Sequence, residues 1–175
     1  MTTFSEFVSS PELEKMIGDK KYPKYKIKFS KIIKKAGIGD SDITDQKASA
    51  KLITGFSSWN WYGFFFGPFW AVFCKMKMGW FAFAAMLIVF LIEDAGVIST
   101  TTPFSSIGST IVFLYFAIYG NSSYFAEIIT KYNAGYKDRM PTSILYIFIL
   151  IAASVAHAFI SEYFFPTEVW IPATQ

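Results

Sequence analysis

The chain has 175 residues, of which 53% are hydrophobic and 20% aromatic, and its formal net charge is +3. This apolar content exceeds that of an ordinary water-soluble domain of the same length, so lipid is the expected environment of part of the chain. The single cysteine, Cys74, excludes an internal disulfide and a site built from several thiolates. Because 11 of the 16 basic residues precede residue 59, we predict a basic N-terminal arm and an apolar membrane domain, both helical.

Residues 1–58 form the predicted arm, which begins with two short helices. Thr3 with Glu6, and Ser10 before Pro11, have the spacing of helix N-caps. No apolar run long enough for a cleavable signal peptide occurs in this arm. We therefore expect the arm to be retained and to stay in the cytoplasm, with its last third acting as a polar hinge.

Residues 24–36, KYKIKFSKIIKKA, place apolar side chains at helical spacing with lysines between them. This pattern predicts a basic amphipathic helix that lies on anionic lipid headgroups. A soluble helix that packs on an acidic partner protein is the alternative. Nucleic-acid binding is not expected, because the arm is short and the acidic residues 40–45 follow closely. The lysines expected to face the headgroups are Lys24, Lys26, Lys28, Lys31, Lys34 and Lys35.

Residues 59–74, WNWYGFFFGPFWAVFC, are apolar but short, and Gly67 and Pro68 lie near their middle. Proline removes a backbone donor and clashes with the preceding helical turn. Lysines precede this segment and also follow it directly at Lys75 and Lys77. Because positive flanks stay in the cytoplasm, we expect a re-entrant or interfacial helix that enters and leaves on the cytoplasmic side. A kinked helix that spans the membrane fully is the alternative.

Three later segments have the length and apolar character of membrane-spanning helices, which need roughly 20 residues. They are residues 78–92, 106–125 and 143–165. The connection after the first contains acidic but no basic residues, whereas the connection after the second contains three basic residues. The positive-inside rule therefore predicts a cytoplasmic N-terminus and an external C-terminus.

Few residues of the membrane domain suggest chemistry. His157 is the only histidine and lies inside the last predicted span, where it is either functional or a neutral imidazole bonded to a neighbouring helix. Glu93 and Asp94 end the first span, where they would bind a cation or mark the outer boundary. We expect no serine, histidine and aspartate to assemble on one membrane face. No metal or cofactor motif occurs, so we expect no catalytic residue, metal or cofactor.

Small and polar residues indicate close helix contacts. Gly63 and Gly67 form a GxxxG pair, a spacing that allows two helices to approach closely. The pair fits packing inside the bundle and self-association equally well. Asn60 and Asn121 are expected to find hydrogen-bond partners on other helices.

The run SWNWYGFFFGPFWAVFCKM, residues 58–76, closely resembles the signature of a family of small bacterial membrane proteins, Domain of Unknown Function 2628, which reads roughly FNWAAFFFGPFWLLYRKM. Residues 22–32 are similar to the lead-in of that family, and Cys74 departs from its usual arginine. The resemblance implies a bacterial inner-membrane protein, and it brings no reaction, cofactor or substrate. The residues that carry it in this run are Trp59, Asn60, Trp61, Phe65, Gly67, Pro68, Trp70 and Lys75. Further along the chain, Asn121 with Tyr124 resembles the Asn-x-x-Tyr of the family.

These features predict a non-enzymatic accessory or scaffold protein of the bacterial inner membrane, as a small subunit of a larger complex or as a homo-oligomer. Its expected partners are anionic lipids and either a membrane protein or further copies of the chain. The alternative is an oligomeric transport or channel component for ions or small solutes, in which the broken segment lines a pathway and His157 titrates inside it. An enzyme acting on lipid is not favoured, because convergent acid, base or metal groups are lacking.

Overall fold

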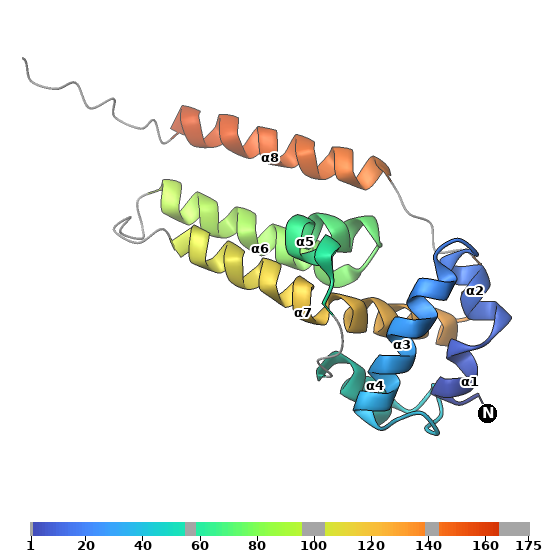
Figure 1. Ribbon diagram of the computed structural model, residues 1–175. Helices are drawn as coiled ribbons and strands as arrows, with labels where there is room; N and C mark the ends of the chain where they lie inside the picture. The colour runs from blue at the N-terminus through green and yellow to red at the C-terminus, as the bar shows by residue number, and fades with distance from the viewer. Residues whose placement is uncertain (1, 55–58, 96–103, 139–143, 165–175) are drawn as a thin grey trace, which may run out of the picture.

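The computed structural model describes residues 2–54, 59–95, 104–138 and 144–164 (Figure 1). Within these ranges the chain is helical and holds no strand, which confirms the all-α prediction. The helices are α1 (Phe4–Val8), α2 (Pro11–Ile17), α3 (Tyr22–Ala36), α4 (Gln46–Thr54), α5 (Trp61–Phe73), α6 (Lys77–Asp94), α7 (Phe104–Asn133) and α8 (Ile144–Phe164).

The first two helices begin where the sequence predicts. The Thr3 hydroxyl accepts from the backbone N–H of Glu6, and the Glu6 carboxylate accepts from the backbone N–H of Thr3 at 2.8 Å. The Ser10 hydroxyl accepts from the N–H of Leu13, with Pro11 in the first turn of α2. These caps satisfy N–H groups that have no partner inside a helix, and both predicted starts are confirmed.

The N-terminal arm folds into a compact unit against the last third of α7. Its core joins buried side chains from α1, α2, α3 and α4 to the same side of α7. The ring of Phe29 stacks on that of Phe125, with 4.1 Å between centroids and 17° between planes. Part of the expected hinge is also structured, because Gln46–Thr54 forms α4 and its Leu52 is fully buried. The remaining core members include Phe4, Phe7, Leu13, Met16, Ile32, Ile128 and Ile129.

The apolar face of α3 differs from the sequence expectation, because it is covered by protein and not open to lipid. Phe29 and Ile32 are fully buried, and Ile33 is 5% exposed. The last third of α7 offers a matching apolar surface, and packing against it removes this face from any membrane. The lysines expected at the headgroups divide into exposed and half-buried side chains. Lys24, Lys31, Lys34 and Lys35 are exposed, whereas Lys26 and Lys28 are half-buried.

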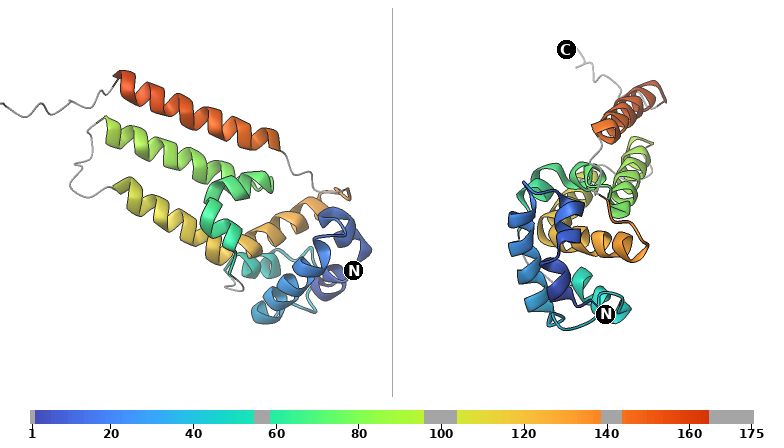
Figure 2. Two further views of the ribbon diagram at one scale, coloured as in Figure 1. Left: turned by 45° about the horizontal axis from the view of Figure 1, so that its top comes forward. Right: turned by 90° about the vertical axis from the view of Figure 1, so that its right-hand side faces the viewer.

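The apolar helices form a layered bundle beside this unit (Figures 1 and 2). α6 lies between α8 and the first half of α7, and the three run along a common direction. α7 bends near its middle, so its second half turns into the N-terminal unit (Figure 2). α3 runs across the bundle direction at the end where this unit lies (Figure 1).

α8 is the one helix in the described ranges that is by itself long and apolar enough to cross a membrane, over Leu145–Phe164. α5 and α6 reach that standard only as a pair, with a bend of 114° between them. The predicted spans at 78–92 and 106–125 fall within α6 and α7. Residues 143 and 165, the ends of the third predicted span, lie outside the described residues. The arrangement with three spans therefore stays a prediction.

Phe29→Ala tests whether the apolar face of α3 is part of the protein core. We expect it to lower the free energy of unfolding by about 3–5 kcal/mol, because it empties a fully buried, stacked position. Ile27→Ala on the same helix, at a side chain that is 60% exposed, should change stability by less than about 0.5 kcal/mol. Thermal unfolding of the purified protein in mild detergent measures both. Similar small effects of the two substitutions would contradict the packing of α3 on α7.

Candidate functional site at the crossing of α5 and α7

The signature residues of α5 hold this helix against the middle of α7. The backbone N–H of Asn60 donates to the carbonyl of Ala117 at 2.7 Å. A β-carbon at Gly63 would lie 2.2 Å from the Phe116 carbonyl oxygen, so the two backbones are in direct contact there. A β-carbon at Gly67 would lie 3.1 Å from the Phe113 ring. The spacing of the GxxxG pair allows either packing inside the bundle or self-association. These two glycines pack inside the bundle, against α7 of the same chain.

The helical path of α5 breaks at Gly67, as the sequence predicts. Gly67 has φ 43° and ψ −121°, and both it and Pro68 are buried. Proline disfavours the helical conformation of the residue before it, and glycine adopts positive φ without a steric penalty. The break turns the second half of α5 so that Trp70 reaches Tyr124 of α7, with 6.2 Å between ring centroids.

Asn60 occupies a narrow space between two glycines. The side chain is 1% exposed, and no hydrogen-bond partner is found for its Nδ2 atom among the described residues. A β-carbon at Gly120 would lie 2.8 Å from this nitrogen and 3.0 Å from the Trp70 ring. The space has no room for a ligand. Asn60 is thus a packing residue before α5 whose side chain makes no cap hydrogen bond, and within the described ranges its Nδ2 atom lacks the partner on another helix that we expected.

A lysine from the N-terminal unit reaches the same crossing. Lys28 Nζ donates to Oδ1 of the fully buried Asn121 at 3.2 Å, and it lies 5.6 Å from the centre of the Tyr25 ring. Burial and the nearby charge of Lys24 lower the pKa of the Lys28 ammonium. The Tyr25 ring also contacts that of Tyr124, at 5.3 Å. Lys28, which we expected at the headgroups, therefore joins α3 to α7.

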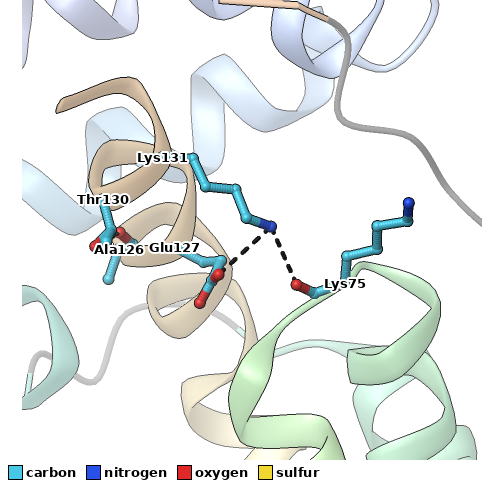
Figure 3. A network of polar contacts seen from close by, with 5 residues as sticks. All are labelled: Lys75, Ala126, Glu127, Thr130 and Lys131. Atoms are coloured by element: carbon cyan, nitrogen blue, oxygen red, sulfur yellow. Dashed lines mark hydrogen bonds and ion pairs between the residues drawn. The ribbon is translucent and has the colours of Figure 1, made fainter. Parts of the chain in front are cut away.

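The turn between α5 and α6 is held by the end of α7 (Figure 3). Lys75 adopts φ 56°, a left-handed conformation that costs a non-glycine residue roughly 1–2 kcal/mol. Its carbonyl accepts from Lys131 Nζ at 3.1 Å, and Lys131 also pairs with Glu127 at 3.4 Å. These contacts stabilise the left-handed residue and with it the sharp bend into α6.

Other signature residues point away from α7. Trp59, Trp61 and Phe65 are 39%, 62% and 62% exposed. The ring of Trp61 stacks on that of Phe65 with 5.9 Å between centroids. Exposed aromatic side chains of this kind are typical of the boundary between lipid and water. The signature thus has an inward set that packs on α7 and an outward aromatic set.

A serine, a histidine and an aspartate do meet between α6 and α8, so our expectation that none would assemble was wrong. The Ser161 hydroxyl donates to Asp94 Oδ2, and His157 Nε2 lies 3.8 Å from the same oxygen. The His157 ring also contacts that of Phe90 at 5.9 Å. The serine is bonded to the carboxylate and not to the imidazole, so this is not a nucleophile activated by a histidine base. It is a polar link between two apolar helices.

The partners in these contacts that were not singled out from the sequence include Gly120, Lys131 and Asp94 as a partner of His157. Gly120 had a usable signal, because a glycine beside Asn121 in an aromatic helix suggests a close approach. The sequence held no signal for Lys131 and Asp94 as partners, because the contacts of Lys131 with Lys75 and of Asp94 with His157 join residues far apart in the chain. Metal binding at Glu93 and Asp94 finds no support either, because no group of three potential ligands gathers among the described residues.

Gly63→Ala tests the backbone contact between α5 and α7. The added methyl would overlap the Phe116 carbonyl, so we expect a loss of at least about 1–3 kcal/mol of stability. Gly108→Ala on α7 is the matched control, because nothing lies within 4 Å of its β-carbon. It should leave stability unchanged or raise it by up to about 1 kcal/mol. Equal melting temperatures for the two variants in detergent would contradict the contact.

Lys131→Met tests the support of the left-handed turn. Removal of a charged donor to the Lys75 carbonyl should lower stability by about 1–2 kcal/mol. Lys15→Met removes a lysine whose ion pair with Asp138 is exposed, with side chains 64% and 79% accessible, and should cost less than about 1 kcal/mol. Chemical denaturation in detergent micelles measures the difference. If Lys131→Met lowers stability no more than Lys15→Met does, the contact from α7 does not stabilise the turn.

Comparison of the sequence with protein-family models found no match, and searches of curated proteins and of solved structures found none. The resemblance to Domain of Unknown Function 2628 rests on residues 58–76, on residues 22–32 and on Asn121 with Tyr124. Most of the signature residues lie on α5, which packs on α7, and Trp70 contacts Tyr124 there. The family assignment remains a proposal.

Proposed function

We propose that this chain is a multi-pass integral membrane protein that serves as a non-enzymatic accessory or scaffold subunit. In this proposal α6, the first part of α7 and α8 cross the bilayer. α5 enters and leaves on the side of the N-terminal unit. That unit lies in the cytoplasm of a bacterium, and the C-terminus lies outside the inner membrane. The distribution of exposed apolar side chains is the observation that carries the proposal.

Exposed large apolar side chains concentrate on α5 to α8. On α8, Phe148, Phe159 and Tyr163 are 63%, 70% and 80% exposed, and Phe81 of α6 is 75% exposed. Among the described side chains of α1 to α4, Ile27 is the only large apolar one that is exposed. Water disfavours such an extended apolar surface, whereas hydrocarbon accepts it. The two parts of the chain are therefore suited to two different solvents.

The geometry of α5 supports an interfacial or re-entrant helix over a kinked span. Even without the break at Gly67, its 13 residues, Trp61–Phe73, would extend only about 20 Å at 1.5 Å per residue, less than the ~30 Å of the hydrocarbon core. It also meets α6 at 114°. If α6 crosses the bilayer, a helix at this angle lies close to the membrane plane.

The positions of the lysines support the cytoplasmic placement of the N-terminal unit. Lys131 contacts Lys75, so the turn after α5 and the end of α7 lie at the same end of the bundle. α1 to α4 pack at this end (Figure 1). The positive-inside rule assigns such a basic end to the cytoplasm.

The contacts of the signature residues support a scaffold over an enzyme. They join α3, α5 and α7 by close packing and buried hydrogen bonds, which is a structural use. Two cavities border the first half of α7, of about 90 Å³ and 280 Å³, and none of their lining residues among the described ones is titratable. An enzyme needs convergent acid, base or electrophilic groups in such a cavity.

The proposal is tested by membrane extraction followed by partner identification. The tagged chain should stay in the membrane pellet through alkaline carbonate and leave it only with detergent. Single-step purification in mild detergent, followed by native mass spectrometry, should then reveal a second membrane protein or further copies of the chain. A folded product released by carbonate contradicts membrane insertion. A monomer that carries only lipid contradicts the scaffold role.

One observation favours transport as the second candidate. His157 Nε2 is buried without a hydrogen bond, 3.8 Å from Asp94, and ionisable groups inside membrane helices are commonly functional. The same purified protein, reconstituted in liposomes, separates the two candidates. A proton or ion flux that disappears in His157→Ala would favour transport. A flux no higher than that of empty liposomes would favour the scaffold role.

A further inference from the structure

Three lysines at one end of the bundle hold their ammonium groups over aromatic rings of the apolar helices. We name Lys21, Lys24 and Lys75 the lysine collar. Two of the rings belong to α5 and the third to the start of α8, so the collar follows the border between the N-terminal unit and the membrane helices. The pairs are Lys21 over Phe73 at 6.0 Å, Lys24 over Tyr62 at 5.6 Å and Lys75 over Tyr146 at 5.2 Å.

The collar lysines have unused capacity for an anion. Within the described residues no carboxylate forms an ion pair with any of them, whereas Lys15 and Lys131 each have one. Lys21 and Lys24 are exposed, and Lys75 is half-buried. An ammonium group has three N–H donors, and contact with a ring face leaves donors free. The collar is thus a set of positive charges positioned by aromatic rings and open to a ligand.

The surroundings of the collar identify the level of the lipid headgroups. Tyr62 is 56% exposed and adjoins Trp61 and Phe65, which are also exposed. Aromatic rings concentrate at this level of a bilayer, and lysine side chains extend along apolar surface to reach its phosphates. α3 carries Lys24 and runs across the bundle direction, as a helix along the membrane plane would (Figure 1).

We infer that the lysine collar binds the phosphate groups of anionic phospholipids in the leaflet next to the N-terminal unit. This inference rests on the proposed membrane function and narrows it to particular residues. Binding at the collar fixes the depth of α5 and the position of α1 to α4 over the bilayer. Lys28 takes no part because it donates to Asn121. Lys31 and Lys34 lie in the second half of α3, and among the described residues neither ammonium group lies over an aromatic ring of α5 or α8.

The test compares two triple variants that remove the same charge. Lys21→Gln, Lys24→Gln and Lys75→Gln together neutralise the collar, and Lys31→Gln, Lys34→Gln and Lys47→Gln neutralise exposed lysines elsewhere on the N-terminal unit. Each protein in detergent is titrated with phosphatidylglycerol or phosphatidylcholine, and bound lipids are counted by native mass spectrometry. Melting temperatures in lipid-free detergent show whether each variant is folded.

We expect the wild type to prefer phosphatidylglycerol and the collar variant to lose that preference, by roughly fivefold for each lysine removed. The control variant should stay within about twofold of the wild type. If both triple variants lose the preference for phosphatidylglycerol equally, the lysines attract anionic lipid without a defined site, and the inference is overturned. A membrane-embedded wild type without lipid preference would overturn it and leave the proposed function standing. Release of an acidic protein from the collar variant, with lipid binding unchanged, would assign the collar to that protein instead.

Discussion

The backbone contact between Gly63 of α5 and Phe116 of α7 is the constraint on which the other contacts depend. At this separation Asn60 can bond to Ala117, and Trp70 can reach Tyr124 beyond the break at Gly67. The direction of α5 in turn determines where the turn at Lys75 lies, and hence where α6 begins. α8 packs on α5 and α6. A larger side chain at the crossing would displace the layers built on it.

The two halves of α7 differ in what covers their apolar side chains. Its first half lies beside α6 and exposes apolar side chains such as Ile111, whereas Phe125 and Ile128 in its second half are fully buried in the N-terminal unit. Near the middle of α7 the buried Asn121 accepts a hydrogen bond from Lys28 of the N-terminal unit.

Local chemistry was predictable from the sequence, and the identity of each packing partner was not. The caps at Thr3 and Ser10 and the break at Gly67 follow from short-range rules, and all three are present. The amphipathic pattern of α3 predicts an apolar face correctly, but periodicity does not reveal whether lipid or protein covers it. The covering surface lies almost a hundred residues later in α7. Distance along the chain also concealed the link between Asp94 and His157.

The continuity of α7 has a mechanical consequence. In the proposed placement, a tilt of its first half relative to the bilayer normal would be passed across the bend (Figure 2) to its second half, where Phe125 contacts Phe29 and Phe4. Thinner bilayers favour larger tilts of long apolar segments. If the first half of α7 spans the bilayer as proposed, a change in bilayer thickness would therefore displace the N-terminal unit.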